Sequence, residues 1–458
     1  MSNQLFSDFE SVNSKAWKQK IQVDLKGLDY NDTLIWNSPE GIDVKPFYNK
    51  EDLERLSISN SNNSTWYIGE SIYVNNIAKS NESALSAITN GSNCIKFIVP
   101  NIDTDLELLL HAIDLDCIHI QIETLFFSLT FFTKNERILN HKNVTVHHDC
   151  IGQLTKDGNW FSSKTEDYAT LEKAILVLKS ISINADIYQN SGATIIQELA
   201  YTLSHLNEYF NFIENNSTLK TLFKTEELVI NINLSIGSNY FFEIAKIRSL
   251  KQLIETLASS YSFKIDLKVN ATPTFRNKTL YDYNVNMLRT TTECMSAILG
   301  GASTIFNQPY DAIYHKSNAF GNRISRNQLL VLQNESYFNQ VNNPSDGSYY
   351  IETLTHQISE KALTIFKDIE LNSGFIDELF KGTIQQKIKE NALKEQDLFN
   401  TNKITLVGTN KFENKNDKMS DNLELYPFLK QNPRKTLIAP IIAKRLSEAY
   451  EQNRLKQE

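Results

Sequence analysis

The sequence predicts an α/β fold in which eight parallel strands close into a (β/α)₈ barrel. Three observations lead to this prediction: short β-rich runs recur, helical stretches separate most of them, and no Gly-rich phosphate loop is present. Strands that alternate with helices are typical of parallel βαβ units. Eight such units can close on themselves, so that no strand edge stays unpaired. An open doubly wound sheet is the alternative, and the eight candidate strands favour the barrel.

The candidate strands are short runs rich in β-branched and aromatic residues. They are Thr65–Ile68, Cys94–Val99, Cys117–Glu123, Val144–Asp149, Ser180–Ile187, Leu228–Ile236, Phe263–Val269 and Ser303–Asn307. Periodic segments lie between them, such as Thr194–Phe212 and Tyr240–Leu257. In the second segment, apolar residues recur at spacings of three and four, which marks one buried helix face. These residues are Ile244, Ile247, Leu250, Ile254 and Leu257.

Three regions are expected along the chain. Residues 1–60 form an N-terminal arm, and residues 61–370 hold the barrel with its trailing helices. Those helices are predicted near Asn327–Gln333 and Leu354–Ile369. Residues 371–458 are expected to hold a linker and a C-terminal helix.

The C-terminal region is predicted in more detail from its composition. Residues 391–435 are poor in apolar residues and rich in Asn and Lys, so a largely extended linker is expected. A final amphipathic helix is predicted to start near Pro440, because proline is favourable in the first turn of a helix. Ile442, Leu446 and Tyr450 are spaced by four and would share a face of it.

Composition excludes several classes of protein. The chain has 458 residues and a net charge of −8, whereas nucleic-acid-binding domains are usually basic. Its four cysteines lie far apart in sequence and are expected to be reduced. The N-terminus shows no signal-peptide pattern, and no run approaches the roughly 20 apolar residues of a membrane span. A cytoplasmic protein that binds neither nucleic acid nor membrane is expected.

Polar residues at the predicted strand ends are the first candidates for chemistry, because barrel enzymes place their catalytic groups there. His147, His148 and Asp149 end the fourth strand and could suggest metal ligands. However, consecutive strand residues point to opposite faces, so the two histidines cannot both face one ion without a bulge. We therefore expect hydrogen-bonded or solvated polar residues and no metal site.

Two further candidates have little support. Asp186 and Gln189 end the fifth strand, and Asp186 could be a general base, but the sequence places no partner beside it. Lys444 and Arg445 are interpreted as a solvated helix face. No nucleophile elbow, Walker loop or GxGxxG fingerprint is present. The chain is therefore expected to contain no catalytic, cofactor-binding or metal residue.

Nine runs, spread over nearly the whole chain, resemble methylmalonyl-CoA mutases and follow the order of that family. They are Asp24-Leu25-Lys26-Gly27, Glu40-Gly41-Ile42-Asp43-Val44-Lys45-Pro46-Phe47-Tyr48, Gly192-Ala193 with Gln197-Glu198-Leu199-Ala200-Tyr201-Thr202-Leu203, Glu243-Ile244-Ala245-Lys246-Ile247-Arg248, Arg289-Thr290-Thr291-Thr292-Glu293-Cys294-Met295, Arg323-Ile324-Ser325-Arg326-Asn327-Gln328, Gly347-Ser348-Tyr349-Tyr350-Ile351-Glu352, Val407-Gly408-Thr409-Asn410 and Arg445-Leu446-Ser447-Glu448-Ala449-Tyr450-Glu451. The resemblance implies the isomerisation of methylmalonyl-CoA and succinyl-CoA, with a radical supplied by adenosylcobalamin. It also implies that acyl-CoA threads through the barrel axis and that a separate C-terminal domain holds cobalamin.

The chain departs from the family where the resemblance places the chemistry. The family run Ser-Gly-Tyr-His-Met-Gln-Glu-Ala-Gly-Ala reads Asn184 to Ala193 here, with Ile187 at the position of the catalytic imidazole. An alkyl group cannot donate the hydrogen bond that an imidazole would. The family run Ile-Arg-Gln-Tyr ends here in Ser71, so the tyrosine that walls the radical's cavity is lost. The run His-Cys-Gln-Thr reads Asn270 to Pro273.

The cobalamin domain is expected to be absent from this chain. Its hallmark is Asp-x-His-x-x-Gly, and none of the eight histidines has a glycine three positions later. We therefore expect a non-catalytic, small accessory subunit that pairs with a large catalytic subunit holding adenosylcobalamin. The alternatives are a barrel lyase or hydrolase that uses Asp149 and Asp186, and a stand-alone acyl-CoA-binding barrel.

The N-terminal arm is the expected contact with the large subunit. It contains many large apolar residues and no βα unit that could bury them. These residues are Phe6, Phe9, Trp17, Leu25, Leu34, Ile35, Trp36, Phe47 and Tyr48. The alternative is that the arm covers the bottom of its own barrel.

Overall fold

Eight parallel strands form one sheet in the computed structural model, which describes residues 12–53, 65–430 and 433–458. Their order in the sheet is β6-β5-β4-β3-β10-β9-β8-β7. They are β3 (Tyr67–Tyr73), β4 (Cys94–Val99), β5 (His119–Thr124), β6 (Val144–His147), β7 (Ser180–Asn184), β8 (Leu228–Ile236), β9 (Ile265–Pro273) and β10 (Thr304–Phe306). Each corresponds to one predicted strand, and β4 and β8 keep their predicted bounds.

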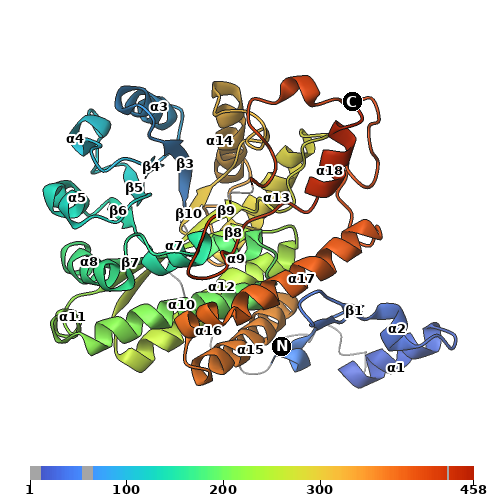
Figure 1. The fold of residues 1–458 in the computed structure, drawn as a ribbon. Helices are drawn as coiled ribbons and strands as arrows, with labels where there is room; N and C mark the ends of the chain where they lie inside the picture. The colour runs from blue at the N-terminus through green and yellow to red at the C-terminus, as the bar shows by residue number, and fades with distance from the viewer. Residues whose placement is uncertain (1–11, 54–64, 431–432) are drawn as a thin grey trace, which may run out of the picture.

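The sheet curls until its two end strands, β6 and β7, meet. Ser182 Oγ donates to the carbonyl of Val146 over 3.2 Å. The backbone N–H of Asn184 donates to Asp149 Oδ2 over 2.8 Å. The strands therefore form a nearly closed barrel with helices around it, as predicted (Figure 1).

Strand β8 shows why these runs form barrel strands. Its even-numbered residues, from Leu228 to Ile236, are apolar, buried and part of the core between strands and helices. Successive residues of a strand point to opposite faces. Its odd-numbered residues accordingly turn to the barrel axis, where they line cavities at the two ends; they are Val229, Asn231, Asn233 and Ser235. The apolar face holds the barrel to its helices, and the polar face is left for a site.

The helices pack their apolar faces on this barrel. The periodic segments form α10 (Ile195–Asn215) and α12 (Tyr240–Tyr261), and the trailing helices form α14 (Ala319–Asn334) and α15 (Tyr349–Leu371). The other helices around the barrel are α3 (Ile77–Thr89), α4 (Leu106–Leu109), α5 (Leu129–Lys134), α6 (Glu136–Leu139), α7 (Cys150–Asp157), α8 (Lys164–Leu178), α9 (Asp186–Asn190), α11 (Ser217–Leu222) and α13 (Val285–Gly300). Among the described residues, no helix is long and apolar enough to cross a membrane.

The described part of the arm has two different halves. Its elements are α1 (Ser14–Asp24), α2 (Tyr30–Leu34), the two-stranded sheet of β1 (Trp36–Asn37) and β2 (Asp43–Val44), and a 3₁₀ turn (Lys50–Asp52). Helices α1 and α2 stand beside the barrel, whereas β1 and the residues after it contact the helices α12 and α15 (Figure 1). Phe6 and Phe9 lie outside the described residues.

Glu40 fixes the second half of the arm to the barrel. Its two carboxylate oxygens accept the backbone N–H groups of Ile195 (3.0 Å) and Ile196 (3.1 Å). These N–H groups belong to the first turn of α10, where a helix has no internal acceptors and favours negative charge. The Trp36 ring packs edge-on against Phe242, with ring centroids 5.9 Å apart. These contacts lie at the N-terminal ends of α10 and α12, so this half of the arm covers the side of the barrel rather than its bottom.

The prediction of an extended linker from residue 391 is wrong for its first part. The chain continues after α15 in α16 (Phe375–Lys381) and α17 (Thr383–Asn400). Helix α17 buries Ile384 and Ile388, and Asn391 donates to the carbonyl of Gly192 over 2.7 Å. The few apolar residues of this helix lie among many Asn and Lys residues, so the composition of the segment did not reveal the helix. Residues 401–430 are irregular, with one 3₁₀ turn (Ser420–Asn422), and the region boundaries at 60 and 370 stay predictions.

The final helix also begins later than predicted. Helix α18 spans Glu448–Leu455, and residues 433–447, which we call the strap, contain no regular helix. The strap's N–H groups donate to the barrel instead of to one another: Ile441 to the carbonyl of Thr155 (2.9 Å), Lys444 to Asn190 (3.0 Å) and Leu446 to Arg276 (2.8 Å). These long-range bonds replace the helix that the spacing predicted after Pro440.

Candidate functional site

A cavity of about 1060 Å³ lies at the carboxyl ends of the barrel strands. We call it the C-terminal cavity. Inward-facing residues near the strand ends form its floor, and strap residues from Pro433 to Ala443 form part of its outer wall. Ligands of (β/α)₈ barrels bind at this end. The cavity is therefore the candidate functional site.

Asp149 lines this cavity, but its carboxylate is fully engaged with the protein. Oδ1 accepts from Tyr209 OH (2.7 Å) and the N–H of Gly152 (2.7 Å), and lies 3.0 Å from His205 Nε2. Oδ2 accepts from the N–H of Asn184. Burial acts to raise the pKa of Asp149, but His205 and the other donors hold it below its ordinary value. A carboxylate stabilised in this way is a poor proton acceptor.

The two histidines before Asp149 face different surroundings, as the strand alternation predicts. His147 lines the C-terminal cavity, and its Nδ1 lies 3.3 Å from Asn233 Nδ2. His148 stacks on Phe127, with ring centroids 5.8 Å apart, and burial lowers the pKa of His148 to about 4. Among the described residues, no group of His, Cys, Asp or Glu has an arrangement that could hold a metal ion.

Asp186 also lines the C-terminal cavity, whereas Gln189 has a structural role. Burial raises the pKa of Asp186, against the opposing effect of the Lys156 charge. Among the described residues, no side chain donates a hydrogen bond to the Asp186 carboxylate. Gln189 Nε2 donates to Glu243 over 2.8 Å. The structure thus brings Asp149 and Asp186 to one cavity, with only Asp186 available to a ligand.

The sequence reasoning missed two charged residues of the cavity floor, Lys96 and Glu123. Lys96 Nζ lies 3.8 Å from Glu123 Oε2 and 4.3 Å from the centre of the Phe306 ring. Glu123 pairs in register with His147 on the neighbouring strand, so these groups lie at one level of the barrel. A signal existed in the sequence for Glu123, because polar residues alternate with isoleucine from His119 to Glu123.

Side chains fill the barrel axis beneath this floor. Gln121 Nε2 donates to Asn270 Oδ1 (2.8 Å), and Asn270 Nδ2 donates to Asn233 Oδ1 (3.2 Å). Asn233 Nδ2 in turn donates to Asn184 Oδ1 over 2.7 Å. Asn270 is 1% exposed. We call this chain of amides the amide plug.

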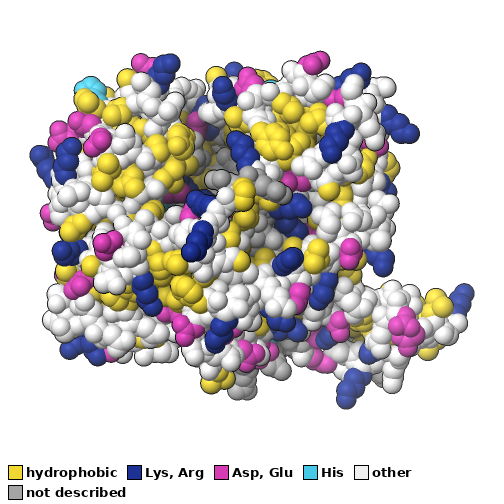
Figure 2. Space-filling model, viewed as in Figure 1, with side chains coloured by type: hydrophobic (Ala, Val, Ile, Leu, Met, Phe, Trp, Pro, Cys, Tyr) yellow, Lys and Arg dark blue, Asp and Glu magenta, His cyan; other side chains and the backbone are white. Residues whose placement is uncertain are grey.

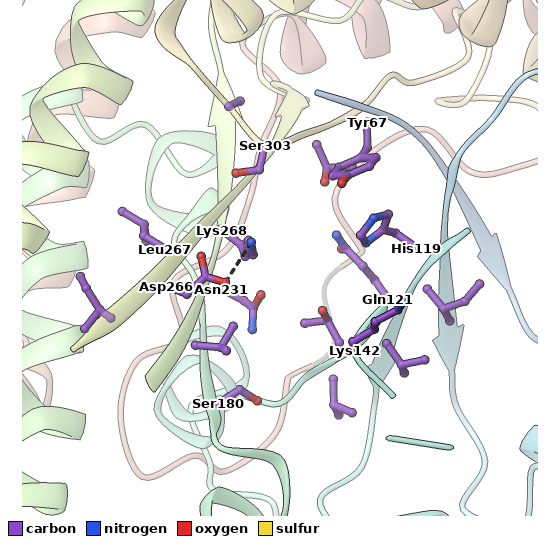
Figure 3. Close-up of a pocket in the computed structure, with 18 of the residues that line it drawn as sticks. Tyr67, His119, Gln121, Lys142, Ser180, Asn231, Asp266, Leu267, Lys268 and Ser303 are labelled. Carbon is purple, nitrogen blue, oxygen red and sulfur yellow. Dashed lines mark ion pairs between the residues drawn. The ribbon is translucent and has the colours of Figure 1, made fainter. Parts of the chain in front are cut away.

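A second, smaller cavity of about 400 Å³ lies on the other side of the amide plug, at the N-terminal ends of the strands. Figure 3 shows Tyr67 and His119 on one side of it and the ion pair of Lys268 and Asp266 on the other. The Tyr67 and His119 rings lie against each other, with centroids 4.0 Å apart. The two cavities share no lining residue, so the plug separates them.

Lys444 and Arg445 do not form the solvated helix face that was predicted. The Arg445 side chain is fully buried and pairs with Glu451 over 2.6 Å. Its Nη1 also donates to the carbonyl of Lys278 (3.1 Å), and its Nη2 donates to that of Pro427 (3.0 Å). Arg445 thus anchors the strap beside the cavity that the strap covers.

The family of the chain follows from comparison with known proteins. The family model described as methylmalonyl-CoA mutase matches residues 101–456. The chain belongs to the methylmalonyl-CoA mutase family. It is 32% identical to the methylmalonyl-CoA mutase small subunit of Porphyromonas gingivalis, over 92% of this chain and 73% of that protein.

This chain covers a smaller share of two other members of the mutase family. The chain is 23% identical to a methylmalonyl-CoA mutase of Rhizobium meliloti, over 93% of this chain and 66% of that protein. It is 28% identical to the methylmalonyl-CoA mutase small subunit of Propionibacterium freudenreichii subsp. shermanii, over 52% of this chain and 39% of that protein.

The departures from the mutase pattern fall on the C-terminal cavity and the axis. Ser71, Ile187, Thr272 and Pro273 line the cavity, and Asn270 belongs to the amide plug. These positions carry hydroxyl, alkyl and amide groups here.

The described residues do not fit the cobalamin that this family uses. Of the eight histidines, all within the described part of the chain, only His147 lines the C-terminal cavity, and it is 2% exposed. Its Nδ1 faces Asn233. The strap, tied to the barrel by its backbone, covers the outer side of the cavity.

Proposed function

We propose that this chain is the accessory, non-catalytic subunit of a heterodimeric, adenosylcobalamin-dependent methylmalonyl-CoA mutase. In this proposal a large catalytic subunit holds the cofactor and interconverts methylmalonyl-CoA and succinyl-CoA. The filled barrel axis is the observation that supports the proposal most directly. A barrel that threads acyl-CoA along its axis needs an open channel, and the amide plug occupies that space.

Opening the plug would be costly. Each hydrogen bond in it joins groups that are largely shielded from water, and Gln121, Asn233 and Asn270 are each less than 10% exposed. A buried polar group left without its partner costs about 1–3 kcal/mol. The free energy needed to break two or three such bonds would offset much of the binding free energy of a ligand. This argument also disfavours a stand-alone barrel that binds acyl-CoA along its axis.

The cavity wall offers little for mutase chemistry. Ile187 replaces the imidazole that would polarise a thioester carbonyl, and an oxyanion needs a hydrogen-bond donor at that point. Ser71 lines the cavity with a small hydroxyl group in place of a phenol ring. A radical intermediate needs an enclosed and shaped space, which the tyrosine would have provided. The lyase or hydrolase alternative is weakened separately, because four donors hold the Asp149 carboxylate and keep its pKa below its ordinary value.

The exposed half of the arm supports a subunit contact. Trp17 is 53% exposed, Val23 is 72% exposed and Leu28 is 64% exposed. Hydrophobic side chains are visible on the lobe formed by α1 and α2, beside the barrel (Figure 2). Large apolar groups at one exposed site are typical of protein interfaces. We therefore assign the contact with the large subunit to α1 and the residues just after it.

Co-expression with a mutase large subunit tests the proposal. The expected result is a stable complex whose activity is destroyed by removing the large subunit's cobalt-ligating histidine. The same complex should keep its activity when Ser71 of this chain, at the position of the family's tyrosine, is changed to alanine. Turnover of methylmalonyl-CoA by this chain alone, supplied with adenosylcobalamin, would overturn the proposal. So would the absence of any complex between the two chains.

A further inference from the structure

The C-terminal cavity contains polar groups that have no hydrogen-bond partner among the described residues. His147 Nε2 and Thr124 Oγ1 are buried, and within the described ranges neither has a hydrogen-bond partner. Lys96 is 7% exposed, yet no described residue accepts a hydrogen bond from its ammonium group. Asp186 accepts none from another side chain. Shielded polar groups without partners are costly, so they point to a ligand that would satisfy them.

The protons on these groups define what a ligand must offer at the floor. Asn233 Nδ2 can only donate, so His147 Nδ1 accepts from it and the His147 proton lies on Nε2. Burial and the nearby Lys96 charge keep the pKa of His147 well below its ordinary value, so the ring is neutral. The floor therefore presents two donors, Lys96 Nζ and His147 Nε2, to an acceptor on the ligand.

The opposite requirement holds at Asp186. Its carboxylate can only accept, and it begins α9 at the cavity wall. Glu123, the second carboxylate of the cavity without a close donor, lies 3.8 Å from Lys96. A ligand that reaches Asp186 must therefore carry a donor, and a charged donor forms the strongest hydrogen bond with a carboxylate.

The charges of the cavity balance without a ligand. Glu123 and Asp186 oppose Lys96 on the floor and Lys156, which is exposed at the rim. Of the remaining charged groups, Glu70 pairs with Arg326 and Arg434 pairs with Asp157, while the charges of Asp149 and the exposed Lys430 have opposite signs. A ligand with a net charge would leave one charge uncompensated in a shielded site. A ligand with one charge of each sign would not.

We propose that the C-terminal cavity binds a small zwitterion of the amino-acid type, with its carboxylate on Lys96 and His147 and its ammonium group on Asp186. Ile98, Leu125 and Phe161 line the same cavity and suit an apolar side chain. The amide plug closes the floor beneath such a ligand, and the strap closes the outer side. The site would give an accessory subunit a way to sense a metabolite without performing chemistry.

Calorimetric titration of the full chain with L-leucine and L-phenylalanine tests this proposal. Saturable binding of at least one of them is expected. Isocaproate lacks the ammonium group of leucine, and isoamylamine lacks its carboxylate. Each should bind about tenfold more weakly than leucine or worse, because each loses a hydrogen bond to a charged group.

Variants assign the binding to the two ends of the site. Lys96→Met should weaken leucine and isocaproate alike, whereas Asp186→Asn should weaken leucine about tenfold and should not weaken isocaproate, because removing a negative charge from the cavity favours an anion. Lys268→Met is the matched control, because Lys268 also lies beside a carboxylate but lines the other cavity. Circular dichroism should show that each variant is folded. If Lys96→Met does not fold, Asp186→Asn still tests the proposal.

Three results would overturn the proposal. The first is the absence of saturable binding for both amino acids. The second is isocaproate binding as tightly as leucine, which would indicate a site for simple anions. The third is a folded Lys96→Met or Asp186→Asn chain that binds leucine as the unmodified chain does. None of these results depends on a partner subunit, so the proposed function is tested separately.

Discussion

Replacing Arg445 with methionine should destabilise the chain more than any exposed substitution on the strap. The Arg445 and Glu451 side chains are both 0% exposed, and their ion pair is 2.6 Å long. Methionine fills a similar space but leaves the Glu451 charge without its cation. It also removes the donors to the carbonyls of Lys278 and Pro427. Breaking a buried ion pair by removing one partner costs about 3–5 kcal/mol, and we expect a loss in that range.

Urea unfolding followed by circular dichroism measures this loss. Arg434→Met is the matched control, because Arg434 lies on the same strap with its side chain 48% exposed and pairs with Asp157. That exposed pair should contribute about 1 kcal/mol or less. The double variant Arg445→Met, Glu451→Gln should recover part of the stability, because a neutral amide removes the uncompensated charge. A loss from Arg445→Met no larger than that of the control, or no recovery in the double variant, would refute the reasoning.

Four further predictions address the site and the partner. Ile187→His alone should give no mutase activity, because groups that act as a unit do not work singly; measurable turnover by this variant would contradict that. Deleting residues 1–40 should abolish capture of the large subunit in a pulldown while circular dichroism shows a folded barrel, and capture at unchanged affinity would place the interface elsewhere. This chain alone should not shift the cobalamin spectrum in an equilibrium titration, and a tight, saturable shift would contradict the missing lower ligand. Burial raises the pKa of Glu198 from 4.5 to about 8, so the folded chain retains a proton that the unfolded chain releases. The stabilisation from this proton is therefore present at pH 4 and is lost as the pH rises to 8. In urea unfolding, the free energy of unfolding of the unmodified chain, relative to that of Glu198→Gln, should fall from pH 4 to pH 8. A difference that stays constant or rises would show that the predicted sign is wrong.

The position of the candidate site could be predicted from the sequence, but the availability of its groups could not. Asp149 was placed correctly at the end of a strand, and it does line the C-terminal cavity. Its donors His205 and Tyr209 come from α10, far along the chain, so no local pattern revealed that both carboxylate oxygens are already hydrogen-bonded. Lys96 was overlooked because a single lysine in an apolar run gives no sign of which face it occupies until the strand register is known.

The C-terminal region shows the same limit for the fold. The spacing of Ile442, Leu446 and Tyr450 favours a helix, and local propensity would allow one from Pro440 onward. In the structure, backbone bonds to α7, α9 and the loop after β9 hold this segment as the strap, and Arg445 is buried against Glu451. Tertiary hydrogen bonds and one buried ion pair thus outweigh the local preference.

The sequence by itself determined the eight strands and the long helices α10 and α12. These features follow from the spacing of apolar residues along each segment and from residue identity, both of which can be read from neighbouring positions in the chain. Only the tertiary structure decided that the amide plug fills the axis, that the strap covers the cavity, and that Asp186 rather than Asp149 is available. Each of these features depends on contacts between groups from segments far apart in the chain. Strand register and barrel closure set these contacts, and no single segment of the sequence specifies them.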